Sequence, residues 1–481
     1  MFCRSWIGSL VPVASIVVCF FPSQSPAQPI QKGDRLTTTV DDAPLVDQST
    51  TLLTVPKGTA LVAEEVNGDW VQVTVERSGK KTTGWIDAKH LAPASSTPER
   101  AAAQPFFQRG TDFFNKGHWG SAIAEFGEAI RIDPKYAEAY NNRGVAYANK
   151  GDLDRAIADY TAAVRLDAKH AKAYSNRGVA YTEKRDLDRA IADFNDALRL
   201  NPSDTAAYYN RGVAYAKKGD FDRAIADNTE AIRLKPKHAE AYGNRGVAYL
   251  DKGDLDRAIA DFNEALRINP KDAEAYNNRG AAYARKGDFE RATGDYTDAI
   301  RLNPKCAAAY YNRGVEHAKI GDLDRAIADL TEAIRLNPKY AEAYCDRGVT
   351  HANKGDLDGA MRDYTEAIRL NPKYAEAYYK RGNAYAKKDD LDRAIADYTE
   401  AIRLNRKYAE AYYGRGNAYG NKGDLDRVIA DYTEAIRLNS KYAEAYLNRS
   451  IAYVKKGDYV KAEKDFAKAK EFGYKPMQRV K

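Results

Sequence analysis

The sequence is poor in sulfur-containing residues, with four cysteines and three methionines in 481 residues. So few cysteines exclude a disulfide framework as the means of holding so long a chain together. Phenylalanine and tryptophan are also scarce, at 14 and 4, whereas tyrosine reaches 34. This skew indicates that one local pattern has been copied many times along the chain.

Neither charge nor apolar content is extreme. Charged residues make up 30% and apolar residues 44% of the chain, which excludes collagen-like, membrane-spanning and wholly disordered proteins. The net charge of +7 is small for this length and mostly falls within residues 451–481. Nucleic-acid binding needs a continuous basic track, so it is not expected here.

The first 27 residues have the order of an export signal. Arg4 precedes an apolar run from Trp6 to Phe21, and small residues follow up to Ala27. The run contains Pro12 and is shorter than the ~20 residues that a bilayer span needs. We therefore expect a signal peptide over residues 1–27 and a periplasmic or secreted protein. The alternative is an uncleaved N-terminal anchor, the only case in which a membrane contact is expected.

Residues 28–92 alternate between apolar and polar residues and contain turn signals. The pair Asn67-Gly68 predicts a hairpin, and four or five short strands of this kind are expected to close into a small β-barrel. The order PKGT, NGDWVQV, GWIDAKHL resembles a bacterial SH3-like domain. Members of that family bind cell-wall or protein ligands, or serve as spacers. Trp70 and Trp85 fit either an aromatic binding face or the barrel core, and residues 93–102 are expected to form a linker.

From Ala103 the sequence repeats every 34 residues. Eleven copies span residues 103–476, and residues 477–481 form a basic tail. We number the places within a copy from its first residue. Each copy contains two stripes with helical spacing, separated by Gly151 and Asp152 in the second copy, which end one helix and cap the next. The fourth place is aromatic throughout: Phe106, Tyr140, Tyr174, Tyr208, Tyr242, Tyr276, Tyr310, Tyr344, Tyr378, Tyr412 and Tyr446.

These signature places resemble the tetratricopeptide repeat family. Tyrosine at places 4 and 11, glycine at 8, alanine at 20 and 27, an aromatic at 24 and proline at 32 agree with the family pattern. The resemblance implies an all-α, right-handed superhelical solenoid of 11 units with the first helices lining a concave groove. A small all-β SH3-like barrel is expected to precede it. Glu463 and Lys470 in the last copy predict a polar C-terminal cap.

Two columns of charge recur beside this signature. Place 7 is arginine in every copy and place 23 is an acid, as in Arg143 and Asp159. Because a partly buried guanidinium needs a carboxylate, we expect eleven pairs that tie each first helix to its second. Because the arginines are expected to serve this structural role, the column is not expected to bind phosphate.

The expected ligand site is on the groove-facing places of the first helices. Asparagine is a poor helix former, yet it recurs at place 6, where its amide can hold a peptide backbone. The column is similar to the asparagine ladder of the O-linked N-acetylglucosamine transferase family, whose catalytic domain has no counterpart here. Recent duplication is the alternative explanation. The predicted groove residues are Asn142, Asn176, Asn210, Asn244, Asn278, Asn312, Asn448, Tyr209, Tyr311, Tyr379, Asn383, Tyr413 and Asn417.

No catalytic, phosphate-binding or zinc motif is recognisable. His317 and His351 are expected in the core rather than on a metal, and Cys306 and Cys345 as free thiols. The sequence predicts an exported, non-enzymatic interaction scaffold without cofactor or metal, which binds a peptide or protein segment in its groove. The alternative is a cell-envelope protein that binds wall polymer through the SH3-like domain and uses the repeats as a spacer.

Overall fold

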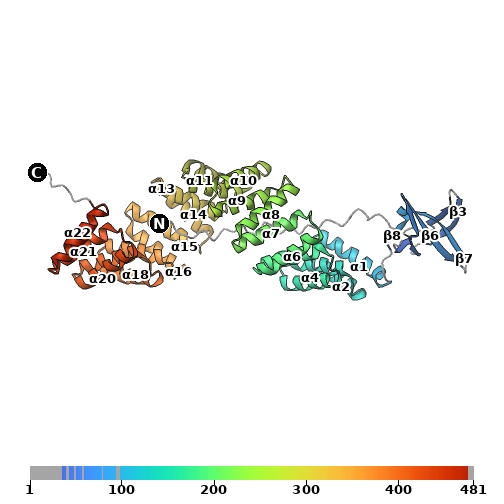
Figure 1. Ribbon diagram of the computed structural model, residues 1–481, viewed down its shortest axis with the longest axis horizontal. Helices are drawn as coiled ribbons and strands as arrows, with labels where there is room; N and C mark the ends of the chain where they lie inside the picture. Colours follow the sequence, from blue (N-terminus) through green and yellow to red (C-terminus); the bar gives the residue numbers. More distant parts are fainter. Residues whose placement is uncertain are drawn as a thin grey trace. The chain divides into compact units, whose positions relative to one another are not determined.

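The computed structural model describes residues 35–38, 43–47, 50–56, 59–77, 80–93 and 98–474 (Figure 1). The expected signal segment 1–27 and tail 477–481 lie outside the described residues. Strands come first and helices follow, and the helices form two compact units that divide between Lys237 and His238. None of the described helices combines the length and the apolar character needed to cross a bilayer.

The described part of the chain before residue 94 is a small all-β region, as predicted. Its two antiparallel sheets have the strand orders β4-β1-β8 and β3-β2-β7-β6-β5. The elements are β1 (Arg35–Thr38), β2 (Ala43–Asp47), β3 (Thr50–Val55), β4 (Ala60–Val62), β5 (Glu65–Asn67), β6 (Trp70–Arg77), β7 (Lys80–Asp87), the 3₁₀ helix η1 (Ala88–His90) and β8 (Leu91–Pro93).

The predicted hairpin at Asn67-Gly68 joins β5 to β6. Asn67 pairs with Trp70, which leaves Gly68 and Asp69 as a two-residue turn. Gly68 has a φ of +60°, a conformation that glycine adopts without steric cost. The turn fixes the register of β6, and with it the face on which each of its side chains lies.

The two tryptophans of this region lie on the outer face of β6 and β7. Side chains alternate across a strand, and Val71 and Val73 are fully buried in the core. Trp70 therefore lies on the opposite face, where it is 42% exposed. Trp85 pairs with Gln72 on the same outer face and is half-buried. The alternative in which Trp70 packs in the barrel core is thus wrong.

The first helix begins earlier than the sequence indicated. It starts at Pro98, so the helix includes the second half of the expected linker, residues 93–102. Proline is well suited to a first helical position, and Glu99 lies in the first turn, where the helix dipole favours an acid. Arg100 also forms an ion pair with Asp133 at the end of the next helix, which ties down this additional turn.

Twenty-two helices follow in the described chain, two for each 34-residue repeat. The first helices are α1 (Pro98–Asn115), α3 (Ala137–Asn149), α5 (Ala171–Glu183), α7 (Thr205–Lys218), α9 (Ala239–Lys252), α11 (Ala273–Lys286), α13 (Ala307–Lys319), α15 (Ala341–Lys354), α17 (Ala375–Lys387), α19 (Ala409–Asn421) and α21 (Ala443–Lys455). The second helices are α2 (Trp119–Ile132), α4 (Leu153–Leu166), α6 (Leu187–Leu200), α8 (Phe221–Leu234), α10 (Leu255–Ile268), α12 (Phe289–Leu302), α14 (Leu323–Leu336), α16 (Leu357–Leu370), α18 (Leu391–Leu404), α20 (Leu425–Leu438) and α22 (Tyr459–Glu471).

A left-handed residue and an aspartate separate the two helices of a repeat, as predicted. Gly151 has a φ of +82°, and the Asp152 side chain accepts a hydrogen bond from the Arg155 N–H at the start of α4. An aspartate caps the second helix of each repeat in the same way from α4 to α22. Arg185 and Asp389 replace the glycine and still have positive φ, at a cost in backbone strain.

The two helices of a repeat pack closely because the first has a glycine at place 8. A Cβ added to Gly144 would lie 2.7 Å from Cε1 of Tyr160 and 3.2 Å from the Ala156 carbonyl oxygen. Within each unit, each second helix also contacts the first helix of the next repeat. The helix pairs therefore stack as a solenoid within each unit.

The last repeat ends the second unit with a surface of mixed character. Glu463 and Lys470 are exposed on α22, as the predicted cap requires. Apolar side chains are exposed beside them: Ile451 and Val454 on α21 are 48% and 49% exposed, and Val460 on α22 is 82% exposed. The final surface is thus polar on part of α22 and apolar beside it.

Candidate functional site

All thirteen predicted groove residues lie on first helices. In the first unit they are Asn142 on α3, Asn176 on α5, and Tyr209 and Asn210 on α7. In the second unit they are Asn244 on α9, Asn278 on α11, Tyr311 and Asn312 on α13, Tyr379 and Asn383 on α17, Tyr413 and Asn417 on α19, and Asn448 on α21. Asn312 is buried, and the others are partly exposed.

Several place-6 asparagines form hydrogen bonds between neighbouring repeats. Asn176 Nδ2 donates to Asn141 Oδ1 at 3.0 Å, and Asn141 Nδ2 donates to Asn142 Oδ1 at 3.1 Å. In the second unit Asn312 Nδ2 donates to Asn277 Oδ1 at 3.0 Å. These amides therefore link the repeats. Each amide has a second N–H and a second acceptor position, so one such bond does not exhaust its capacity.

Sequence reasoning missed the partner residues of this ladder. Asn141 and Asn277 stand at place 5, one residue before the asparagine column, and asparagine is not constant there. The available signal was that Asn141 and Asn277 each precede an asparagine and lie 35 residues before another. That spacing links place 5 of one repeat to place 6 of the next.

Where the asparagine column breaks at Asp346, a tyrosine supplies the hydrogen bond between repeats, and another tyrosine accepts one from Asn448. Tyr311 Oη donates to Asp346 Oδ2 at 2.7 Å, and Asn448 Nδ2 donates to Tyr413 Oη at 3.0 Å. Glycine replaces asparagine at Gly414 for a steric reason, because a Cβ there would lie 2.9 Å from the Tyr398 ring. At Asp346 and Asn448 the link between places 5 and 6 thus persists with changed chemistry.

The predicted pair Asn383 and Asn417 accepts hydrogen bonds from the second helices. Tyr398 Oη donates to Asn383 Oδ1 at 2.7 Å, and Tyr432 Oη donates to Asn417 Oδ1 at 2.6 Å. Asn448 Nδ2 also donates to Asn417 Oδ1, at 3.1 Å. The structure therefore brings Tyr413, Asn417 and Asn448 together in one polar cluster.

Three pairs of tyrosine rings lie close together in the second unit. The ring centroids of Tyr311 and Tyr340 are 4.7 Å apart. Those of Tyr379 and Tyr408, and of Tyr413 and Tyr442, are 5.0 Å apart. Each pair joins place 5 of a repeat to place 34 of the same repeat. Aromatic pairs at these distances attract one another and offer flat apolar contact to a ligand.

Asp346 has an unusual electrostatic environment for a carboxylate. Burial raises its pKa from 3.8 to about 6, although the Tyr311 hydroxyl and the Lys380 ammonium act in the opposite direction. The nearby Glu376 and Glu342 carboxylates raise this pKa further. The chain therefore places a titrating acid where most other copies have an asparagine.

Asp346→Asn is expected to stabilise the second unit by up to about 3 kcal/mol at pH 8, since one pKa unit corresponds to about 1.4 kcal/mol. The folded pKa of Asp346 exceeds the ordinary value, so the folded chain retains a proton that the unfolded chain has released. This contribution to stability is full below pH about 4 and is lost as the pH rises through about 6. Hydrogen exchange of α13 and α15 from pH 5 to 8, corrected for intrinsic exchange, measures the effect. The exposed Asp112→Asn on α1 is the control, and parallel profiles for wild type and Asp346→Asn would contradict the assignment.

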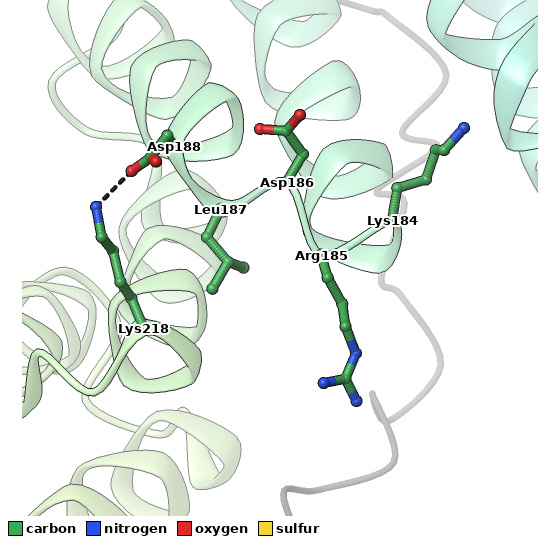
Figure 2. Close-up of a pocket in the computed structure, with 6 residues that line it drawn as sticks. All are labelled: Lys184, Arg185, Asp186, Leu187, Asp188 and Lys218. Atoms are coloured by element: carbon green, nitrogen blue, oxygen red, sulfur yellow. Dashed lines mark hydrogen bonds and ion pairs between the residues drawn. The ribbon is translucent and has the colours of Figure 1, made fainter.

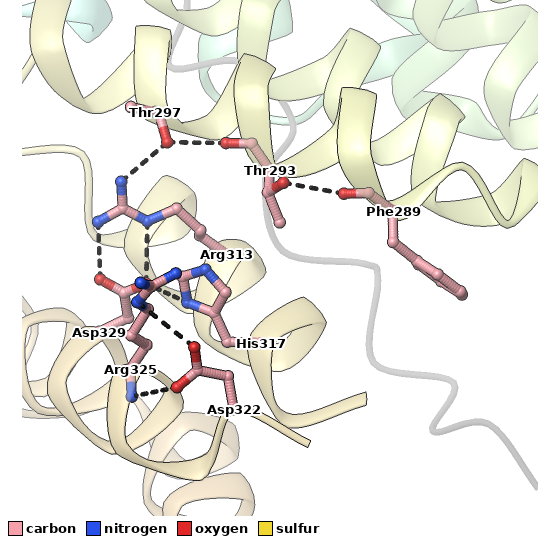
Figure 3. Close-up of polar contacts among 8 residues, drawn as sticks. All are labelled: Phe289, Thr293, Thr297, Arg313, His317, Asp322, Arg325 and Asp329. Atoms are coloured by element: carbon pink, nitrogen blue, oxygen red, sulfur yellow. Dashed lines mark hydrogen bonds and ion pairs between the residues drawn. The ribbon is translucent and has the colours of Figure 1, made fainter. Parts of the chain in front are cut away.

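The eleven predicted pairs between arginine and an acid are all present. In Figure 3, Arg313 donates through Nε to Asp329 Oδ2 at 2.9 Å and through Nη2 to Asp329 Oδ1 at 2.8 Å. The corresponding acceptors for the other arginines are Glu125, Asp159, Asp193, Asp227, Asp261, Asp295, Asp363, Asp397, Asp431 and Asp465. The pairs tie first helix to second, as expected.

Most of these arginines also reach a third helix, which the sequence did not predict. Arg313 Nη1 donates to Thr297 Oγ1 at 3.0 Å (Figure 3), and Arg279 Nη1 donates to Asn263 Oδ1 at 2.7 Å. Thr297 and Asn263 stand at place 25 of the preceding repeat. One guanidinium therefore joins three helices and two repeats.

The histidines and cysteines form no metal site among the described residues, which contain no group of three potential metal ligands. His317 Nδ1 lies 3.1 Å from Asp329 Oδ2 (Figure 3), and His351 Nδ1 lies 3.2 Å from Asp356 Oδ2. Cys306 is half-buried and Cys345 is buried, and both are free. These residues therefore pack within the repeats.

An open pocket in the first unit is lined by both basic and acidic side chains. It is lined by Lys184, Arg185, Asp186, Leu187, Asp188 and Lys218 (Figure 2). Lys218 forms an ion pair with Asp188, and Lys184 forms one with Asp154. The lysines are thus paired within the protein and leave little excess charge for a ligand.

Comparison with known proteins gives a consistent family match. The tetratricopeptide repeat pattern matches residues 148–205, 175–239, 209–273, 277–341, 409–442 and 443–472, and a pattern described as TPR repeat matches residues 110–151, 352–389 and 382–423. Among curated proteins, none matches the chain significantly.

Several solved structures are similar to parts of the chain. A tetratricopeptide repeat protein from Parabacteroides merdae is 24% identical, with 52% of this chain and 99% of that one covered and a TM-score of 0.44. MamA is 32% identical, with 33% and 93% covered and a TM-score of 0.32. YrrB, described as a TPR protein with an unusual peptide-binding site, is 29% identical, with 40% and 97% covered and a TM-score of 0.35.

Proposed function

Because the chain belongs to the tetratricopeptide repeat family, we propose that it is an exported, non-enzymatic scaffold that holds an extended protein segment on its first helices. The repeat fold supports a role in protein–protein interaction. The observation that carries the finer proposal is the chemistry of places 5 and 6. Partly exposed amides and phenols recur there from repeat to repeat, and both donate and accept hydrogen bonds.

This chemistry suits a peptide backbone better than a particular side chain. A backbone in an extended segment presents one donor and one acceptor at nearly every residue. The arginines and acids that recur in every repeat at places 7 and 23, by contrast, are paired with one another, as in Arg313 with Asp329. Binding is therefore expected to depend on the first-helix face, with the arginine column acting only as support.

Site-specific crosslinking tests the proposal in the full-length protein. A photoreactive phenylalanine analogue is placed at Gly243, a place-5 residue on α9, and at Asn278 on α11. A Cβ at Gly243 would meet nothing within 4 Å, so a side chain can leave the backbone there without a clash at its first atom. We expect both positions to capture the same protein, identified by mass spectrometry.

Gly294 provides the matched control for this experiment. It is an exposed helical glycine on α12, and its added Cβ also meets nothing within 4 Å. Capture at Gly294 but at neither first-helix position would refute the proposed face. Export is tested in the same cells, because retention of the protein in the cytoplasm with residues 1–27 uncleaved would contradict that part of the proposal.

A second candidate function is supported by the position of Trp70. This residue is 42% exposed on the outer face of β6, with Trp85 on the same face. Exposed tryptophans suit the binding of a cell-wall polymer by an SH3-like domain, with the repeats as a spacer. Loss of sedimentation with purified cell walls in Trp70→Ser, together with no capture at Gly243, would favour this alternative.

A further inference from the structure

The N-terminal ends of four consecutive first helices combine an aromatic ring with a carboxylate. Tyr340, Tyr374, Tyr408 and Tyr442 are the N-cap residues of α15, α17, α19 and α21. Two residues after each of them a glutamate lies in the first helical turn. We call these four tyrosines and the four glutamates the acidic aromatic face.

The glutamates of this face differ from the other recurring acids of the repeats. The place-23 acids pair with arginine, most place-18 aspartates pair with a lysine of the next repeat, and most place-26 acids pair with the arginine three residues later. In the described part of the chain, however, Glu342, Glu376, Glu410 and Glu444 form no ion pair. The helix dipole favours an acid in the first turn, so the fold accommodates these charges while leaving them available to a ligand.

The tyrosines and glutamates of neighbouring repeats converge. The Tyr408 ring lies 5.0 Å from that of Tyr379, and the Tyr442 ring lies 5.0 Å from that of Tyr413. Burial raises the pKa of Tyr408, and the carboxylates of Glu376 and Glu410 raise it further. The Tyr408 ring is therefore close to carboxylates from two repeats, as is the Tyr442 ring, which lies near Glu410 and Glu444. This part of the aromatic strip lies within a negative field.

This combination is not a constant property of the repeat. In the first unit, the pair recurs as Tyr136 with Glu138 in repeat 2, where the Arg100 guanidinium already lies 3.7 Å from the centre of the Tyr136 ring. The next two copies have His170 with Lys172 and Asp204 with Ala206 instead. Lys387 and Lys455 stand eleven residues after the glutamates of their helices, which is about 16 Å along a helix axis. Lys380 is closer, four residues after Glu376 on α17. An uninterrupted run of four such pairs is therefore particular to repeats 8–11.

We propose that the acidic aromatic face docks an extended protein segment rich in lysine and arginine. A cation attracts both the face of a tyrosine ring and a nearby carboxylate, so each basic side chain of the ligand gains two favourable contacts. An acidic segment is repelled, and a neutral one gains only stacking. This inference rests on the proposed function and specifies the chemistry of the partner.

Peptide binding to the full-length protein tests this inference. The probes are fluorescein-labelled nine-residue peptides of alternating lysine and glycine, glutamate and glycine, or serine and glycine, and fluorescence anisotropy gives the Kd. We expect the lysine peptide to bind at least tenfold more tightly than the other two. The net charge of the protein is +7, so non-specific attraction would favour the glutamate peptide instead.

The variant Glu376→Gln/Glu410→Gln is expected to bind the lysine peptide at least tenfold more weakly, and the loss is expected to shrink at high salt. Glu138→Gln is the matched control, because Glu138 occupies the same place in repeat 2, and its Kd is expected to equal that of the wild type. Hydrogen exchange of α17 and α19 confirms that the variant is folded. Equal binding of the lysine peptide by wild type and double variant, or no preference for it over the other peptides, would overturn the inference.

The two proposals fail in different ways. If crosslinking at Gly243 captures a segment without basic residues and the lysine peptide does not bind, the acidic aromatic face is refuted while the scaffold function stands. If neither crosslinking position captures a protein and Gly294 does, the scaffold function fails, and this inference fails with it.

Discussion

Phe262→Ala is expected to destabilise the second unit by about 3–5 kcal/mol, the usual cost of removing a fully buried phenylalanine. Phe262 on α10 is 0% exposed. Its ring packs against Gly246 of its own repeat, where an added Cβ would lie 2.8 Å from the ring, and within one cluster with Ala281 and Ala282 of the next repeat. The truncation therefore leaves a cavity at a junction of three helices.

Native-state hydrogen exchange is the appropriate measurement, because repeats contact only their neighbours and lose stability locally. We expect faster exchange in α9, α10 and α11 than in α19 to α22. Phe289→Ala is the matched control, since Phe289 on α12 is 38% exposed, and it is expected to cost less than about 1 kcal/mol. Similar losses in the two variants would contradict the packing described for Phe262.

Asp295→Ala is expected to cost about 3–5 kcal/mol, because it leaves the Arg279 guanidinium partly buried without its carboxylate. Arg279 donates to both Asp295 oxygens, at 2.8 and 2.7 Å, and only 8% of the Asp295 side chain is exposed. The same guanidinium holds Asn263 of the preceding repeat. Hydrogen exchange is expected to increase in α10, α11 and α12 together.

Two further variants separate the effect of the charge from that of lost packing. Glu125→Ala removes the corresponding acid of the first repeat, where the Arg109 side chain is 47% exposed, and is expected to cost less than about 1 kcal/mol. Arg279→Met/Asp295→Leu removes both charges of the buried pair and is expected to cost less than Asp295→Ala alone. If this double variant were the least stable of the three, the guanidinium would not be the source of the loss.

The sequence predicted the helical region in detail because the same local signals recur in every copy. The 34-residue period, Gly151 with Asp152 between two helices, and the small residue at Gly144 each act within one repeat. The pairing of Arg143 with Asp159 was predictable for the same reason, since both residues belong to one helical hairpin. The right-handed twist expected for the superhelix stays a prediction.

The N-terminal region was predicted less completely. The hairpin at Gly68 follows from two residues and was correct, as was the all-β character. The start of α1 at Pro98 was not predicted. Pro98 and Glu99 suit a first helical turn, and the ion pair of Arg100 with Asp133 adds a contact that the local sequence does not show. The outward position of Trp70 was not predicted, because it depends on which face of β6 packs into the core, and Val71 and Val73 occupy that face.

For this protein, the sequence by itself determined the number of repeats, the helices of each repeat and the charge pairs inside it. Only the tertiary structure decided how neighbouring repeats use their side chains. Asn176 reaches Asn141, Tyr311 reaches Asp346 and Arg313 reaches Thr297 because stacked helices bring these atoms within hydrogen-bonding distance. The periodic pattern shows which residues recur, but the angle and distance between successive helix pairs determine which of them meet. The face available to a partner is therefore set by the stacking of the repeats.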